Sequence, residues 1–178
     1  MGRPAFVRDR ILAAAFDLIA VEGYEAVSTR AIAAAAKVGP ASMFKHFPSK
    51  ESLGRELYAL ALAPLQHQFA DLTASAPEPG AAVTTAVELL YRAYDERPRM
   101  TALLIFPPHE FTPWEIDPAN PRAVRSVLTA LTRLDADDAA ILWGALTGPL
   151  QDRFLRRRSG TMSPFAAAHA ARLIRLLP

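Results

Sequence analysis

The sequence predicts an all-α protein with about nine helices. Alternation of apolar and polar residues at a period of two, which marks β-strands, is absent along the chain. Alanine and leucine dominate, and both residues favour helices. Apolar residues also recur at intervals of three and four, as they do along one face of a helix. These patterns leave no segment that predicts a strand.

The composition limits the classes of protein to which the chain can belong. Of its 178 residues 51% are hydrophobic, yet no apolar run approaches the length that spans a bilayer, and no signal peptide is recognisable. Cysteine is absent and the histidines are scattered, so we expect no disulfide, no metal site and no cofactor. We expect a soluble cytoplasmic protein without a membrane partner.

The first helix is expected from about Ala5 to Val21. Gly23 is its expected C-cap, because glycine adopts the left-handed conformation readily. Arg3, Arg8 and Arg10 lie near its start and could contact phosphates. The apolar stripe consists of Ile11, Ala14, Ala15, Leu18 and Ile19. This stripe should complete a three-helix core with Ala26, Ile32, Ala36, Met43 and Phe47.

Two short helices are expected between Val27 and Leu53. Ser28 is a good N-cap for the first, since its hydroxyl can accept from an N–H group of the first turn. Gly39 caps the second, with Pro40 at the first helical position, where its missing N–H costs nothing. Only Lys37 to Gly39 is free to turn. Two short helices joined by so short a turn predict a helix-turn-helix.

The second of these helices, roughly Pro40 to Phe47, has two unlike faces. Its expected core side carries Met43, Phe44 and Phe47, and its outward side carries Ala41, Ser42, Lys45 and His46. Small residues let the backbone approach base edges in a major groove, and Lys45 can reach guanine or phosphate. A further helix start at Ser49, with Lys50 in its first turn, predicts a phosphate site. Every lysine of the chain lies in this window, as Lys37, Lys45 and Lys50.

The run from Ala31 to Leu53, AIAAAAKVGPASMFKHFPSKESL, resembles the DNA-binding helix-turn-helix of the TetR family of transcriptional repressors. The likeness extends from about Arg8 to Tyr58. The family's glycine in the turn is Lys37 here, so a residue other than glycine has to adopt a left-handed conformation. The family's tyrosine is Phe44, which lacks the hydroxyl that usually reaches a phosphate. The matching positions are Ile32-Ala33, Val38, Ala41-Ser42, His46-Phe47, Ser49-Lys50-Glu51 and Leu53.

The resemblance implies a DNA-binding domain over residues 1–48, and an all-helical effector-binding and dimerisation domain over residues 49–178. It implies binding to palindromic double-stranded operator DNA through the major groove. The expected DNA-binding residues are Ser28, Thr29, Arg30, Lys37, Gly39, Pro40, Ala41, Ser42, Phe44, Lys45, His46 and Lys50.

Several helices are expected in the second domain. The first begins at Ser49 and extends to about Thr73, with Pro64 as a site of kinking. The others are expected over Ala81–Glu96, Met100–Phe106, Arg122–Leu134 and Asp135–Arg158, and from Ser163 onward. A proline-rich loop is expected over Pro107–Pro121.

Bulky aromatic side chains with few polar neighbours recur along these helices. Such a lining can enclose one small apolar or aromatic effector, although a filled core would have the same composition. The candidate ligand-binding residues are Tyr58, Leu62, Gln66, Phe69, Tyr91, Tyr94, Met100, Leu104, Phe111, Trp114 and Trp143.

The last two helices are apolar on more than one side. A surface helix of a monomer needs one apolar stripe, and a second would leave an exposed patch. We therefore expect a homodimer formed by two-fold pairing of these helices. The candidate interface residues are Leu142, Leu146, Leu150, Ala167, Ala170, Ala171, Ile174 and Leu177.

The sequence thus predicts a sequence-specific transcriptional regulator, a repressor released from its operator by a small, mostly apolar effector. The alternative is a constitutive DNA-binding dimer without an effector. An enzyme is not expected, because no nucleophile with a base, paired carboxylates or phosphate loop stands at recognisable spacing.

Overall fold

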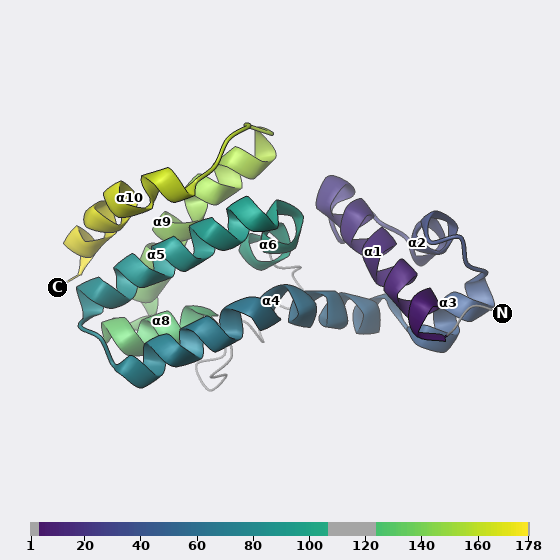
Figure 1. The fold of residues 1–178 in the computed structure, drawn as a ribbon, viewed down its shortest axis with the longest axis horizontal. Helices are drawn as coiled ribbons and strands as arrows, with labels where there is room; N and C mark the ends of the chain where they lie inside the picture. The colour runs from purple at the N-terminus through teal and green to yellow at the C-terminus, as the bar shows by residue number, and fades with distance from the viewer. Residues whose placement is uncertain (1–3, 107–123, 178) are drawn as a thin grey trace. The chain divides into compact units, whose positions relative to one another are not determined.

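The computed structural model describes residues 4–106 and 124–177, and within these ranges every regular element is helical (Figure 1). The predicted all-α fold is therefore confirmed. The described α-helices are α1 (Pro4–Glu22), α2 (Thr29–Ala35), α3 (Pro40–His46), α4 (Lys50–Ser75), α5 (Pro79–Glu96), α6 (Pro98–Ile105), α8 (Val124–Thr132), α9 (Ala136–Leu155) and α10 (Ala166–Leu173). Two 3₁₀ turns, η2 (Ser163–Phe165) and η3 (Ile174–Leu176), flank α10. In the described part, none of the helices has the length and apolar character that a membrane span requires.

The chain divides into two compact units, residues 1–61 and residues 62–178. Helix α4 supplies its first turns to the first unit and the remainder to the second. It includes Pro64 without ending there and continues to Ser75.

Helices α1, α2 and α3 share the core of the first unit, which positions the helix-turn-helix. Ile11, Ile32 and Met43 have almost no exposed surface. Ala26, predicted to join this core, is exposed, and Val27 is buried instead. Ala26 belongs to the turn over residues 24–26, whereas Val27 lies directly before the extended N-cap Ser28.

Helix α5 is the centre of the second unit and packs against α6, α8, α9 and α10. Figure 1 shows α10 lying along α5. The buried face of α5 carries Ala82, Val83, Ala86, Val87, Leu90, Tyr91 and Tyr94. Their spacing of three and four residues is the helical period that the sequence predicts.

Local signals account for the start of α9, and a distant residue accounts for the start of the last helix. The Asp135 carboxylate accepts from the N–H groups of Asp137 and Asp138, at 3.0 and 2.9 Å, as an N-cap does. The last helical segment begins with η2, whose first N–H groups are bonded by Asp95 of α5.

Candidate nucleic-acid interface

Helix α2 begins as predicted, at a serine cap. Ser28 Oγ accepts from the N–H of Ala31 at 3.1 Å, which satisfies one of the free donors of the first turn. Thr29, half-buried, and Arg30, exposed, follow on the first turn. The start of α2 therefore presents polar side chains to solvent.

The turn between α2 and α3 places Lys37 in the left-handed region, with φ of 54°. This confirms the expectation that a residue other than glycine adopts this conformation here. Gly39 is the N-cap of α3 and Pro40 occupies its first turn, also as predicted.

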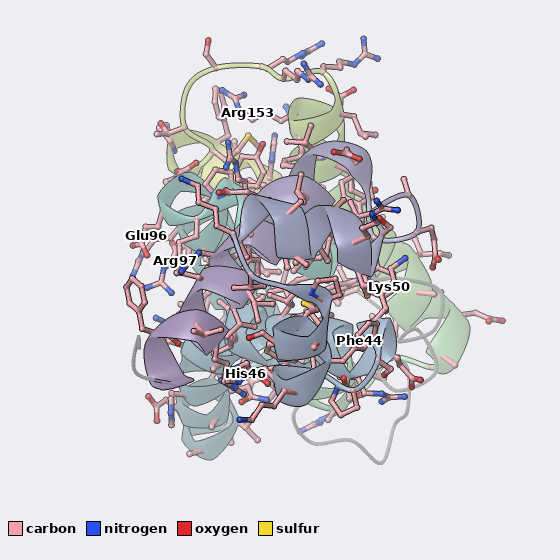
Figure 2. All side chains as sticks on the ribbon, turned by 90° about the vertical axis from the view of Figure 1, so that its right-hand side faces the viewer. Phe44, His46, Lys50, Glu96, Arg97 and Arg153 are labelled. Carbon is pink, nitrogen blue, oxygen red and sulfur yellow. The ribbon has the colours of Figure 1, made fainter. Side chains whose placement is uncertain are left out.

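Helix α3 buries one side and exposes the other. Met43, and Phe47 at its C-cap, are buried, while Ala41 and Lys45 are exposed, and Ser42 and His46 are half-buried. The placement of Phe44 on the core side is wrong, since its ring is 50% exposed. Met43 and Phe47 are four residues apart and so face the same way, whereas Phe44 is turned about 100° from Met43. Figure 2 shows Phe44 and His46 on the ribbon.

The start of α4 is held by two serines. Ser49 Oγ accepts from the N–H of Ser52 at 3.0 Å, and Ser52 Oγ accepts from the N–H of Ser49 at 3.1 Å. This reciprocal pair has the geometry of a capping box, with serine in the place of glutamate or glutamine. It fixes the direction of the first turn, whose backbone N–H groups favour an anion.

Lys50, in that first turn, reaches back to the segment before α2. Its ammonium donates to the carbonyl of Glu25 at 3.1 Å and lies 4.5 Å from the centre of the Tyr24 ring. Figure 2 shows its position in the first unit. The positive charge is thus held near the start of α4 by two contacts, a placement that suits a phosphate contact.

All twelve candidate DNA-binding residues are exposed or half-buried, and they come from the start of α2, the turn, α3 and the start of α4. Two of the arginines that could contact phosphates also make contacts within the unit. Arg8 pairs with Glu56 and lies 5.4 Å from the centre of the Phe47 ring. Arg10 donates to the carbonyls of Ala36 and Lys37. Arg3 lies outside the described residues.

Comparison with known proteins identifies this arrangement. Residues 11–57 match the family model of bacterial regulatory proteins, tetR family. The TetR family transcriptional regulator PfmR from Thermus thermophilus is 25% identical, with a TM-score of 0.68 over 94% of this chain and 95% of that chain. Residues 11–57 therefore carry the helix-turn-helix domain of the tetR family. It is a DNA-binding transcriptional regulator, and the family and fold point to a regulator and away from an enzyme.

Two further solved structures share the fold across both units. FadR from Bacillus subtilis, solved in complex with stearoyl-CoA, is 11% identical, with a TM-score of 0.75 over 96% of this chain and 99% of that chain. The fatty acid degradation regulator FadR from Bacillus halodurans is 14% identical, with a TM-score of 0.68 over 93% and 97%. At these identities the likeness shows the fold alone. Comparison with curated protein sequences gave no match.

The candidate ligand-binding residues fall into three groups. Leu62, Phe69, Tyr91, Tyr94 and Leu104 are buried in the second unit, and Gln66, Met100 and Trp143 are half-buried there. Tyr58 is buried in the first unit. Phe111 and Trp114 lie outside the described residues.

Sequence reasoning missed the partner of Tyr91. Its hydroxyl is hydrogen-bonded to Nδ1 of His169 on α10 at 2.7 Å, across 78 residues of sequence. Burial raises the pKa of Tyr91 to about 12. Burial, and then the charge of Arg172, lower the pKa of His169 below its usual value. Helical periodicity cannot reveal such a pair, because the two residues belong to different helices.

The candidate interface residues divide by burial. Leu142, Leu146, Leu150 and Ala170 are buried within the single chain, whereas Ala167, Ala171 and Ile174 are exposed and Leu177 is half-buried. A side chain that is already buried in its own chain has no surface left to bury against a partner. Any pairing surface on α9 and α10 has to use their exposed residues, which include Ile141, at 61%, and Leu155, at 68%.

Proposed function

We propose that this TetR-family chain is a homodimeric repressor that leaves its operator when a small, mostly apolar effector binds its second unit. The observation that carries the DNA-binding part is the exposed face of α3, where Ala41, Phe44 and Lys45 stand clear of the core. Small and apolar residues on such a face allow close approach to base edges, and the lysine supplies a donor to guanine or phosphate.

The proposed dimer would bury apolar surface that is exposed to water in the single chain. Large hydrophobic side chains are exposed on or beside α9 and α10, namely Ile141, Leu155, Phe165, Ile174 and Leu176. Monomers seldom expose contiguous apolar patches, so a two-fold pairing of these helices supports the proposal. Such a pair would present two α3 helices to half-sites roughly 34 Å apart.

The effector is proposed from the aromatic composition around α5 and from the folds that the chain shares. FadR from Bacillus subtilis was solved with stearoyl-CoA, which makes long-chain acyl-CoA a first class of compound to test. Trp143 is half-buried on α9, so its fluorescence offers a direct readout of binding. The alternative is a constitutive DNA-binding dimer whose second unit only pairs.

The test of DNA binding is selection of a duplex site from random sequence, followed by mobility-shift titration at several salt concentrations. A selected palindrome bound far more tightly than unrelated duplex supports the proposal. Equal affinity for all sequences would contradict sequence-specific regulation.

The test of the effector adds stearoyl-CoA, free stearate and coenzyme A to the bound complex. Release by the acyl compounds, together with a change in Trp143 fluorescence, supports an apolar effector. Release without a fluorescence change would argue against a site near Trp143. The variant Trp143→Phe is the control that shows which part of the fluorescence change comes from Trp143. If no compound in a broad apolar panel alters binding, the constitutive alternative is favoured.

A further inference from the structure

The turn between α2 and α3 is closed by two backbone hydrogen bonds. The N–H of Val38 bonds the carbonyl of Ala33 at 2.9 Å, and the N–H of Lys37 bonds that of Ala34 at 3.0 Å. This is the pattern of a Schellman motif, which ends a helix with one residue in the left-handed conformation. Glycine normally holds that position because a β-carbon is strained there. Here the position is occupied by Lys37.

The carbonyls of the C-cap residue Ala36 and of Lys37 are bonded by a side chain of α1. A single guanidinium nitrogen of Arg10 donates to the carbonyl of Ala36 and, at 2.9 Å, to the carbonyl of Lys37. A cation at this place is favoured twice, by the hydrogen bonds and by the negative end of the α2 dipole. The Arg10 guanidinium also lies 5.7 Å from the centre of the Phe6 ring.

We propose that Arg10 is a positioning residue for DNA binding, acting through the backbone of the turn. It ties α1 to the carbonyls on both sides of the strained position, and so holds the turn in the one conformation that sets the direction of α3. The inference rests on the proposed function, because α3 is there the helix that enters the groove. The hydrogen bonds from Arg10 offset the strain of a β-carbon at the left-handed position of Lys37. A glycine at this position would not be strained and would not need these bonds.

The experiment is a double-mutant cycle between Arg10 and Lys37, read by affinity for the selected duplex. Arg10→Met keeps an unbranched, largely apolar stem and removes the guanidinium donors. We expect it to weaken binding about tenfold, the size expected for lost hydrogen bonds to a charged group. In the Lys37→Gly background the same change should cost less than about threefold, because glycine adopts the left-handed conformation without strain.

Lys37→Ala is the matched control. It removes the lysine charge, as Lys37→Gly does, but keeps a β-carbon at the strained position. The Arg10→Met effect should therefore remain about tenfold in the Lys37→Ala background. Arg10→Lys should recover most of the affinity, since an ammonium can also donate to two carbonyls. Equal losses in the glycine and alanine backgrounds would overturn the proposal.

Amide hydrogen exchange supplies a second readout that needs no DNA. Exchange of the Val38 N–H should accelerate about tenfold in Arg10→Met, while that of Ile32 N–H, bonded to Ser28, should change far less. Unchanged exchange at Val38 would refute the role of Arg10 in the turn. If the unmodified protein binds no duplex at all, the proposed function fails, and Val38 exchange still decides whether Arg10 holds the turn.

Discussion

The hydroxyl of Tyr91 on α5 and Nδ1 of His169 on α10 form a hydrogen bond of 2.7 Å, with the two rings edge to face. The Phe165 ring stacks on the His169 ring. The tyrosine hydroxyl donates when Nδ1 of His169 carries no proton, and Nδ1 donates to the hydroxyl oxygen when it is protonated, as it is in the charged histidine. The pair joins the central helix of the second unit to the helix that carries part of the proposed dimer surface.

This pair predicts a loss of stability at both ends of the pH range. The pKa of His169 is lowered in the folded state, so its contribution is complete above its usual value of 6.5 and is lost as pH falls through the folded value. The pKa of Tyr91 is raised to about 12 from 10.0, so its contribution is lost as pH rises between these values. Thermal unfolding followed by circular dichroism across this range measures both losses.

Two substitutions separate the residues. His169→Phe should flatten the acid side of the profile, and Tyr91→Phe should flatten the alkaline side. His67, exposed on α4, is the control, and His67→Phe should leave the acid side as it was. If His169→Phe loses as much stability at acid pH as the unmodified protein, other groups cause that loss.

Asp95→Ala should destabilise the second unit. Its carboxylate accepts from the N–H groups of Met162 and Ser163, at 2.6 and 2.8 Å, and so fixes the start of the last helical segment. Loss of bonds to a charged group costs about 1–3 kcal/mol, measurable as a lower midpoint in denaturant. The neighbouring Glu96 is exposed, and Glu96→Ala should stay within about 0.5 kcal/mol of the unmodified protein. Equal effects of the two changes would contradict the capping role.

Lys50→Ala should weaken binding to all duplexes alike and reduce the dependence of log affinity on log salt by about one unit, as loss of one phosphate contact does. Lys45→Ala should also change which sequences are preferred. Arg92 on α5, which is exposed in the second unit, gives the control variant Arg92→Ala, with no expected effect. Salt slopes unaltered in both lysine variants would remove these residues from the interface.

Phe44→Tyr should strengthen DNA binding by about threefold to tenfold, the worth of one added hydrogen bond. The ring is half-exposed on α3, and the TetR resemblance implies that a hydroxyl here reaches a phosphate. Sequence preference should not change, because a phosphate contact carries no base information. Parallel titrations of two unrelated duplexes check this, and a gain confined to one of them would indicate a base contact.

Ala167→Glu with Ala171→Glu should dissociate the proposed dimer and abolish operator binding together. Both alanines are exposed on α10, so a charge there enters the paired surface without disturbing the core. Light scattering at micromolar concentration measures the mass. Ala130→Glu, exposed on α8, is the control and should leave a dimer. A monomeric unmodified protein would contradict the pairing itself.

The sequence by itself determined the helices and the helix-turn-helix. The first helix was expected over Ala5–Val21 and spans Pro4–Glu22, and the serine cap of α2 lies at the predicted residue. These features depend on residues a few positions apart, because caps and apolar periodicity act within one or two helical turns. The left-handed Lys37 was implied by the resemblance to the TetR family, whose glycine stands at this position.

Only the tertiary structure decided which side chains meet across helices. The sequence gives no sign that Arg10 bonds the carbonyl of Ala36, 26 residues away. Leu146 and Leu150 were expected at a partner and are buried in their own unit, because burial depends on which neighbouring helix covers each face. The Tyr91–His169 and Asp95–Ser163 bonds join α5 to the last helical segment across 78 and 68 residues. Such contacts are set by the packing of whole helices, a property that no local pattern encodes.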